Sequence, residues 1–362
     1  MNAGAWRGRR VFLTGHTGFK GGWLALLLAE MGAEVHGYAL EAPTEPSFFA
    51  EARVRGCLAS HAVADVRDAA RLRDAMAAAR PEAVFHLAAQ PLVRRSYREP
   101  AETFETNVMG TVNLLQACAA VPGIRAVVNV TSDKCYENRE RPEPYREDES
   151  MGGFDPYSAS KGCAELATAA WRRSFLAPKG VRTASARAGN VIGGGDWAED
   201  RMVPDFLRAI DAGHGLELRA PGATRPWQHV LEPLSGYLAL AGRLLAEGGE
   251  RFEGGWNFGP APGDERTVRW MAERLCEGMP GARWGVDPAA GRQPHEATLL
   301  ALDSSKARAL LGWAPRWDAA EAIRRTLEWH RAWRAGQDMR AFSAAQARDH
   351  AAAGAAAGSA QP

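Results

Sequence analysis

The feature that most constrains the fold is a glycine-rich turn near the N-terminus, set between two apolar stretches. Residues 9–15 have the pattern of a buried strand, and residues 19–32 have that of an apolar helix ending at a glycine. The turn between them carries Gly15, Gly18 and Gly21 at G-x-x-G-x-x-G spacing. Glycines at this spacing let the backbone approach a pyrophosphate, which the N-terminal end of the next helix attracts. The pattern favours a dinucleotide-binding turn over a purely structural one.

Strand-like and helix-like segments alternate along the rest of the first half. The further expected strands are residues 34–40, 83–89, 125–132 and 181–193, and the further expected helices are residues 68–81, 103–120 and 157–175. Strands that alternate with helices form βαβ units, whose right-handed crossovers place the strands parallel in one sheet. The sequence therefore predicts an α/β fold with a Rossmann-type, doubly wound parallel sheet.

The alternation stops near residue 190, which predicts a change of role along the chain. We expect residues 1–190 to form the dinucleotide-binding Rossmann domain. Residues 191–335 are rich in loops and predict a smaller C-terminal lobe that mainly binds the substrate. The tail, residues 336–362, ends in a low-complexity stretch with few groups to bury, so we expect it to be partly disordered.

Composition excludes several classes of function. Of the 362 residues, 46% are hydrophobic and 24% are charged, and the formal net charge of +1 gives no global attraction to nucleic acid or membrane. We recognise neither a signal peptide nor an uncharged apolar run of about 18 residues. The five cysteines are scattered, without zinc spacing or a disulfide framework. These features predict a cytoplasmic protein with no bound metal.

The acidic residue that usually follows a dinucleotide-binding turn is not obvious. Glu41 is the only candidate at the end of the second expected strand, and it comes late for binding the ribose hydroxyls. Asp65 follows the next apolar piece, where it could reach the adenine amino group or could instead cap a helix. Because no arginine beside Glu41 could bind a 2′-phosphate, the sequence favours NAD over NADP.

Tyr157 and Lys161 are candidates for proton transfer. They are four residues apart on an expected helix and therefore share one face. A nearby ammonium favours phenolate, so we expect Lys161 to lower the pKa of Tyr157. Alone, this pair could be an ordinary surface pair. It gains weight from Ser132, Asp133 and Lys134, at the end of an expected strand, because doubly wound sheets place their ligands there.

Together these segments resemble the extended short-chain dehydrogenase/reductase family, over about residues 8–330. The matching positions are Gly15, Gly18, Gly21, Asp65, Val66, the segment His86-Leu87-Ala88-Ala89, Asn107, Ser132, Tyr157 and Lys161. The resemblance implies NAD as cofactor and a nucleotide-activated sugar as substrate. It implies cofactor contacts from Gly15, Thr17, Gly18, Phe19, Lys20, Gly21, Asp65, Val66, Leu87, Ala88, Ala89, Asn107, Tyr157 and Lys161.

Within that family, the segment Ser132-Asp133-Lys134 is similar to that of the sugar-nucleotide 4,6-dehydratases, although Lys134 stands where most of them carry Glu. The resemblance implies a CDP-linked hexose that is oxidised at C4, with Tyr157, Ser132 and Lys161 taking part, and then loses water. Asp133 is the expected acid and Lys134 the expected base. The alternatives are an epimerase of the same family, which typically has uncharged residues at the last two places, and a non-catalytic NAD-binding scaffold.

The resemblance also implies how the substrate and a second subunit are bound. The expected substrate contacts come from Gln90, Asn190, Arg201, Arg225, Arg292 and His295. Arginine suits a diphosphate because its planar fork bonds two oxygens at once, although these arginines could also be ordinary surface residues. The apolar helices at 103–120 and 157–175 imply a homodimer or a dimer of dimers, but their apolar faces could equally pack in the core.

Overall fold

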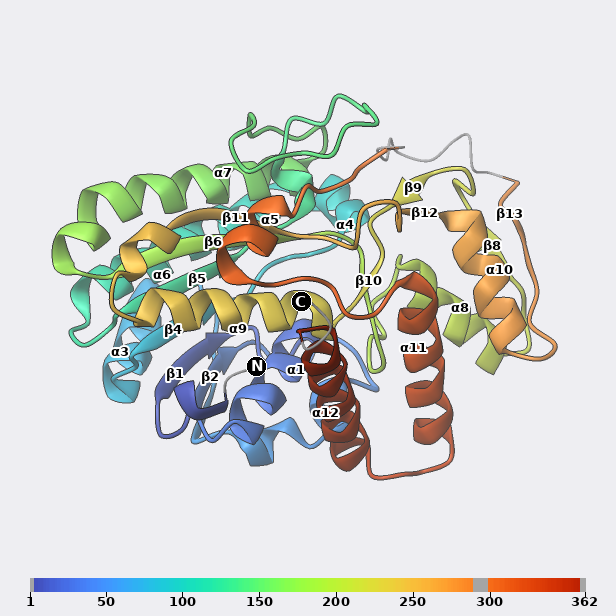
Figure 1. Ribbon diagram of the computed structural model, residues 1–362, viewed down its shortest axis with the longest axis horizontal. Helices are drawn as coiled ribbons and strands as arrows, with labels where there is room; N and C mark the ends of the chain where they lie inside the picture. Colours follow the sequence, from blue (N-terminus) through green and yellow to red (C-terminus); the bar gives the residue numbers. More distant parts are fainter. Residues whose placement is uncertain (1–2, 289–298, 359–362) are drawn as a thin grey trace.

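Seven parallel strands form the main sheet of the computed structural model, which describes residues 3–288 and 299–358 (Figure 1). In sheet order they are β11 (Gly254–Phe258), β6 (Arg182–Ala188), β5 (Ala126–Val130), β4 (Ala83–His86), β1 (Arg10–Thr14), β2 (Glu34–Ala39) and β3 (Ser60–Val63). The chain moves outward from β1 in both directions, so its path reverses between β1 and β4. The predicted Rossmann-type sheet is confirmed, and ligands of such sheets bind at this reversal.

Alternate side chains of each strand supply two separate cores. Val11 and Leu13 of β1 face the cluster that holds α1 (Phe19–Glu30) and α9 (Leu231–Leu245). Phe12, between them, faces the cluster on the other side. That side is covered by α3 (Ala69–Ala79) and α6 (Gly110–Ala120), and α7 (Pro156–Trp171) packs beside α6. Both faces of the sheet are therefore covered, as a parallel sheet requires.

A smaller lobe with its own core lies beside the sheet (Figure 1). Phe206, Met271 and Leu327 come from three of its helices and are buried together. The lobe consists of α8 (Met202–Asp211), α10 (Val268–Gly278), α11 (Ala319–Arg334), β8 (Leu216–Leu218) and β13 (Trp284–Val286). Strand β11 and helix α9 also follow residue 190, but β11 is part of the sheet and α9 packs against it. Residues 191–335 are therefore shared between the sheet unit and the lobe.

Short elements complete the described chain. They are α2 (Phe48–Glu51), α4 (Val93–Arg98), α5 (Pro100–Phe104), β7 (Val191–Ile192), β9 (Thr224–Arg225), β10 (Gln228–His229), β12 (Arg266–Thr267) and several single turns. The strand expected over 181–193 is divided. It ends at Ala188, and β7 pairs with β10 instead of the main sheet. The break lies at Gly189, where a Cβ would come within 2.3 Å of the Pro226 ring.

The C-terminal tail differs from the sequence prediction. It forms α12 (Met339–Gly358) rather than a disordered segment. Alanine has the highest helix propensity, so an Ala-rich stretch forms a helix once a few side chains anchor it. The Trp329 indole donates to Ser343 at 2.9 Å, and His350 lies 2.9 Å from the Glu232 carboxylate, with both side chains fully buried. These contacts attach α12 to α11 and α9.

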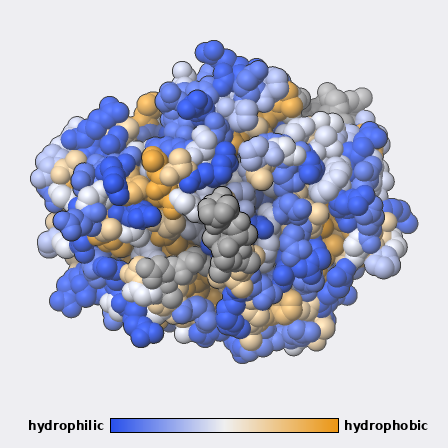
Figure 2. All heavy atoms as spheres, in the orientation of Figure 1, coloured by the Kyte–Doolittle hydropathy of each residue, from blue (hydrophilic) through white to orange (hydrophobic). Residues whose placement is uncertain are grey.

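The visible face is mainly hydrophilic, with apolar residues in small groups (Figure 2). Within residues 3–288 and 299–358, no helix combines the length and apolarity needed to cross a bilayer. In the same residues, no three His, Cys, Asp or Glu side chains are grouped so that they could hold a metal ion.

Candidate active site

The glycine turn brings the end of β1 against the end of β4. Gly15 has a φ of +76°, and a Cβ there would lie 2.7 Å from the backbone nitrogen of Ala88. A Cβ on Gly21 would lie 2.1 Å from the carbonyl oxygen of Gly15. Any larger residue at either position would therefore force the turn, the helix and β4 apart. Steric crowding in the structure thus explains why two of the three positions, 15 and 21, require glycine.

Hydrogen bonds hold this turn in place while the start of α1 stays open. The Thr14 hydroxyl accepts from the backbone N–H groups of Leu87 and Ala88, both at 3.2 Å. The Thr17 hydroxyl donates to the carbonyl of Leu40 at 2.9 Å. Helix α1 begins after Gly18, and no side chain in the described part of the chain caps its free N–H groups. This arrangement fits the pyrophosphate of a dinucleotide.

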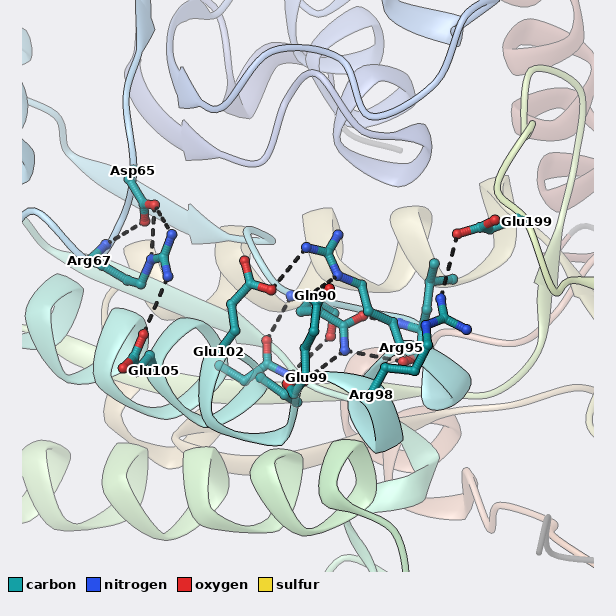
Figure 3. Close-up of polar contacts among 12 residues, drawn as sticks. Asp65, Arg67, Gln90, Arg95, Arg98, Glu99, Glu102, Glu105 and Glu199 are labelled. Carbon is teal, nitrogen blue, oxygen red and sulfur yellow. Dashed lines mark hydrogen bonds and ion pairs between the residues drawn. The ribbon is translucent and has the colours of Figure 1, made fainter. Parts of the chain in front are cut away.

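The adenosine end of the expected cofactor site carries an ion pair that the sequence did not reveal. The Asp65 carboxylate accepts from Arg67 at 2.6 Å, and Arg67 also reaches Glu105 (Figure 3). Hydrogen bonding by Arg67 lowers the pKa of Asp65. Val66 is buried beside Gly110, whereas Glu41 is exposed. An anionic Asp65 fits the expected contact with an amino group, but its orientation depends on Arg67.

The side chains of two predicted site residues, Gln90 and Asn107, use their hydrogen-bonding groups within the chain. The Gln90 side chain, which is labelled in Figure 3, donates to Leu92 and Thr103 and accepts from the Leu92 backbone. The Asn107 side chain bonds both backbone groups of Gln90 and donates to Ser160 at 2.9 Å. Both therefore shape the loop after β4, and direct contact with substrate or cofactor stays a prediction for them.

The expected catalytic residues converge at the end of β5. Ser132 follows that strand, and its hydroxyl donates to Asp133 at 2.9 Å. The backbone N–H of Lys134 donates back to the Ser132 hydroxyl. Tyr157 lies in the first turn of α7, and the Lys161 ammonium is 5.9 Å from the centre of its ring. All of these side chains except that of Lys134 are buried.

Asp133 is placed to carry a proton. Burial raises the pKa of its carboxyl, while Lys134, the Ser132 hydrogen bond, Arg225 and Lys20 act in the opposite direction. One of its oxygens, Oδ2, has no hydrogen-bond partner among the described residues. A buried carboxyl with an unused oxygen and a raised pKa has the properties of a general acid.

The pKa of Tyr157 contradicts the sequence prediction. Burial raises it to about 12, and the hydrogen bond with Ser132 only partly offsets this effect. Burial also lowers the pKa of the Lys161 ammonium to about 8. Desolvation disfavours the charged form of each group, and here it outweighs the attraction between them. The chain alone therefore holds Tyr157 as a neutral phenol.

Lys20 links the glycine turn to these catalytic candidates. It is the second residue of α1, where a positive charge opposes the helix dipole. Burial lowers its pKa to about 8, with smaller contributions from the nearby cations Arg201 and Lys161, and Asp133 and Asp196 counteract them. The sequence assigned Lys20 to cofactor binding, but its electrostatic neighbours also include the expected catalytic acid.

The arginines expected to bind substrate fall into two groups. Arg201 pairs with Asp196 at 3.0 Å and influences the pKa of Tyr157, and Arg225 is buried and influences that of Asp133. The lobe therefore brings both of these arginines to the catalytic candidates. Asn190 follows β6, and its carbonyl accepts from Gln228. Two further predicted contacts, Arg292 and His295, lie outside the described residues.

Sequence reasoning missed a buried ion pair behind the catalytic residues. Glu165 and Arg187 contact each other at 2.8 Å, and each side chain is only 5% exposed. The signal was available, because Glu165 follows Lys161 by four residues on the same helix face. A charged residue among the buried positions of α7 requires a partner, but its identity cannot be read from the spacing.

Comparison with known proteins agrees with this geometry. The sequence profile described as the NAD dependent epimerase/dehydratase family matches residues 11–253. The CDP-glucose 4,6-dehydratase of Salmonella typhimurium is 54% identical over 343 residues, which cover 92% of this chain and 94% of that protein. The chain therefore belongs to the NAD dependent epimerase/dehydratase family.

Solved structures show the same fold. The dTDP-glucose 4,6-dehydratase of Streptomyces venezuelae, solved with NAD bound, is 25% identical and superposes with a TM-score of 0.75, covering 91% of this chain and 99% of that one. A UDP-glucose 4-epimerase of Stenotrophomonas, also solved with NAD, gives a TM-score of 0.78 at 21% identity, covering 91% and 99%. Dehydratases and epimerases thus share this architecture, and only the chemistry of the site separates them.

Proposed function

We propose that this protein is a CDP-glucose 4,6-dehydratase, which converts CDP-D-glucose to CDP-4-keto-6-deoxy-D-glucose and water with NAD as cofactor. The observation that carries the proposal is Asp133, a buried carboxyl of raised pKa that hydrogen-bonds to Ser132. Loss of water needs an acid of this kind, whereas oxidation and reduction at C4 alone do not. The similarity to the Salmonella typhimurium protein supports the choice of sugar and nucleotide.

The first step is oxidation at C4 of the hexose. Tyr157 takes the proton of the C4 hydroxyl, and the Ser132 hydroxyl, which donates to Asp133 in the protein without substrate, turns to donate to the same oxygen. NAD held by the glycine turn would supply the acceptor and later the donor of a hydride, which ends at C6 as a proton returns to C5, and a positive charge that favours ionisation of a phenol. Lys161 adds a second positive charge on the same helix face. These charges oppose the effect of burial, which alone holds the pKa of Tyr157 at about 12.

The second step is loss of water across C5 and C6. The C4 ketone acidifies the C5 proton, and a base removes it while Asp133 protonates the departing C6 hydroxyl. Lys134 is our candidate for the base, because it directly follows Asp133 and is half-buried. This role requires a neutral amine at that step. The cofactor ends the cycle in its starting form, so it need not leave between turnovers.

The substrate diphosphate is held by cations of the lobe. Arg225 acts electrostatically on Asp133, and Arg201 acts on Tyr157. A diphosphate bound between the two arginines would therefore place the attached hexose toward Asp133. Asn190 lies on the connection between β6 and β7 and is the proposed neutral donor. Arginine provides paired hydrogen bonds to phosphate oxygens in addition to charge.

We also propose a homodimer, alone or paired into a dimer of dimers, formed by α5, α6 and α7. Met109 and Leu166 support this proposal, because they are 51% and 60% exposed. Met109 ends the helical turn Glu105–Met109 that joins α5 to α6 and contacts α7, and Leu166 belongs to α7. Exposed apolar side chains on adjacent helices are typical of an interface.

The five free cysteines support a reducing, cytoplasmic setting.

A panel of nucleotide hexoses tests the function. The purified protein is incubated with CDP-, dTDP-, GDP- and UDP-glucose, with and without added NAD, and mass spectrometry follows loss of one water. We expect this loss with CDP-glucose, together with the ultraviolet absorbance in alkali that a 4-keto-6-deoxy sugar gives. A product of unchanged mass would support an epimerase instead, and no reaction with any of the four would support a non-catalytic scaffold.

A further inference from the structure

A buried carboxylate sits one helical turn beyond Lys161 on α7. The Glu165 side chain accepts hydrogen bonds from the hydroxyl groups of Thr131 and Ser185, the latter at 2.6 Å. It also accepts two bonds from Arg187, at 2.8 and 2.9 Å. Both carboxylate oxygens are therefore satisfied by three neighbours on β6 and at the end of β5.

Arg187 extends the network to the other side of the catalytic loop. Its Nη1 donates to the Tyr136 hydroxyl at 2.7 Å and to the carbonyl of Glu147 at 3.1 Å. The Tyr136 hydroxyl in turn donates to the Asn257 side chain at 2.7 Å. Since Asn257 belongs to β11, the network connects the catalytic helix with three strands of the sheet.

The hydroxyl groups of Thr131 and Tyr136 lie on either side, in the sequence, of the residues that carry the proposed chemistry. Thr131 precedes Ser132, and Tyr136 follows the short turn Asp133–Cys135. The Thr131 hydroxyl is bonded to Glu165, and the Tyr136 hydroxyl is bonded to Arg187. We propose that Glu165 and Arg187 are positioning residues that fix this loop against α7 and so set the location of the Asp133 carboxyl. This inference rests on the proposed function, because it assigns a role within that reaction.

Such a role affects the two chemical steps unequally. Tyr157 and Lys161 belong to α7 itself, so the helix positions them whether or not the loop is anchored. Asp133 belongs to the loop, and its Oδ2 has no hydrogen-bond partner among the described residues. A displacement of about 1 Å can reduce a rate by about 10²-fold, since proton transfer needs close contact. Ser132 also belongs to the loop, but it gives the oxidation at C4 one supporting hydrogen bond, whereas Asp133 carries the proton in the loss of water. Loosening the loop should therefore slow the loss of water more than the oxidation at C4.

Deleting single hydroxyls tests this better than removing a charge. A change at Glu165 or Arg187 would leave the other charge buried and could unfold the protein. Thr131→Val instead removes the hydroxyl bonded to Glu165, and Tyr136→Phe removes the hydroxyl bonded to Arg187. Both variants keep the shape of the side chain. Ser185→Ala is the matched control, because it removes a hydrogen bond to the same carboxylate from a strand rather than from the loop.

The kinetic measurement separates the two steps. After rapid mixing with CDP-glucose, absorbance of the reduced cofactor reports oxidation at C4, and quenched samples report loss of water. We expect Thr131→Val and Tyr136→Phe to slow the loss of water at least tenfold and the oxidation at C4 by a clearly smaller factor, so that reduced cofactor accumulates. Ser185→Ala should stay within about twofold in both steps. Equal slowing of both steps, or an equal effect of Ser185→Ala, would overturn the proposal.

A second readout does not depend on the reaction. Infrared spectroscopy of the substrate-free protein, recorded over a range of pH, detects the carbonyl bands of protonated carboxyls, and the band that is lost in Asp133→Asn is that of Asp133. Thr131→Val and Tyr136→Phe should shift this band, and Ser185→Ala should leave it in place. An unshifted band in both loop variants rejects the positioning role, even if the unmodified protein dehydrates CDP-glucose. Failure of the unmodified protein to release water from any nucleotide hexose rejects the proposed function separately.

Discussion

Two sets of buried ionisable groups meet α7 one helical turn apart, the first at Tyr157 and Lys161 and the second at Glu165, and their surroundings differ completely. In the pair Glu165–Arg187, each side chain is bonded on several sides by the chain itself. In the set formed by Asp133, Tyr157 and Lys161, burial dominates instead, and the pKa of each group moves toward its neutral form. The pair Glu165–Arg187 is therefore a satisfied set, whereas the other is an unsatisfied set, in which Oδ2 of Asp133 has no hydrogen-bond partner among the described residues.

The difference shows what each set can do. A buried ion pair with all its hydrogen bonds resists change, because removing either partner leaves an isolated charge. A buried acid and a buried phenol that lack such partners exchange protons with whatever binds beside them. The satisfied set is suited to holding the loop in place, and the unsatisfied set is suited to chemistry. Each prediction below tests one side of this contrast.

The largest expected effect is that of Tyr157→Phe. Without the phenol hydroxyl, no group takes the proton from C4, so we expect turnover to fall by about 10²- to 10⁴-fold. Affinity for NAD should hold within a few-fold, which titration of protein fluorescence measures. The control is Tyr97→Phe, which removes the same hydroxyl from a tyrosine that is 37% exposed. Turnover within tenfold of the unmodified value in Tyr157→Phe would remove this residue from the proton-transfer role.

Asp133→Asn should reduce activity and raise stability together. We expect the loss of water to slow by about 10²-fold or more, while oxidation at C4 still reduces the cofactor. Burial raises the pKa of Asp133 in the folded state, so the folded protein binds this proton more tightly than the unfolded chain. Stability then falls as pH rises above the usual carboxyl pKa of about 4, and the group destabilises the fold at neutral pH.

Replacing the carboxyl by an amide removes that destabilisation. The variant should have a larger free energy of unfolding than the unmodified protein at pH 7, and the difference should shrink as pH approaches about 4. Thermal unfolding at several pH values measures it. A variant that is less stable than the unmodified protein at pH 7 would show that Asp133 is a structural residue like Glu165.

Arg187→Met tests the other side of the contrast. Removing the guanidinium leaves Glu165 buried without its partner, so we expect a loss of about 3–5 kcal/mol in the free energy of unfolding. Arg67→Met is the control, since Arg67 also pairs with a carboxylate but its side chain is 37% exposed, and its loss should stay within about 1 kcal/mol. Denaturant titration measures both. Equal losses would mean that burial does not distinguish the two pairs.

The sequence predicted those parts of the molecule that local pattern determines. The spacing of Gly15, Gly18 and Gly21 between a strand and a helix identified the Rossmann sheet, since few other folds need glycines there. The spacing of Tyr157 and Lys161 likewise placed both on one face of α7. Such features depend on residues that are close together in the chain, so their spacing alone is enough to predict them.

What the sequence missed depends on residues far apart in the chain. The partner of Glu165 is Arg187 on another strand, and β11 joins the sheet after the lobe has begun. Residues 336–362 were expected to be partly disordered, and the helix α12 within them was not foreseen, because its anchor on Glu232 lies more than a hundred residues away. The pKa of Tyr157 was expected to fall, but spacing alone gives no measure of how deeply α7 is buried. Each of these errors concerns tertiary packing and burial.

The smallest predicted effect connects the two sets of charges. Burial lowers the pKa of Lys161 to about 8, and the negative charge of Glu165 partly offsets it. Because the protonated ammonium is the active form, kcat/KM should fall above about pH 8, and Lys161→Arg should remove this decline since arginine stays protonated. Lys20 has a pKa of about 8 as well, so Lys20→Met is the control that keeps the decline in place.

Glu165→Gln should then shift the decline to lower pH. Neutralising residue 165 removes a charge that favours the ammonium form of Lys161, so the pKa of Lys161 falls further and activity is lost earlier as pH rises. Ser185→Ala keeps the carboxylate and should leave the profile unchanged. If the pH profile of kcat/KM in Glu165→Gln matched that of the unmodified protein, the pair Glu165–Arg187 would act on the loop alone and not on the charge of Lys161. A shift would show that one buried carboxylate serves both sets.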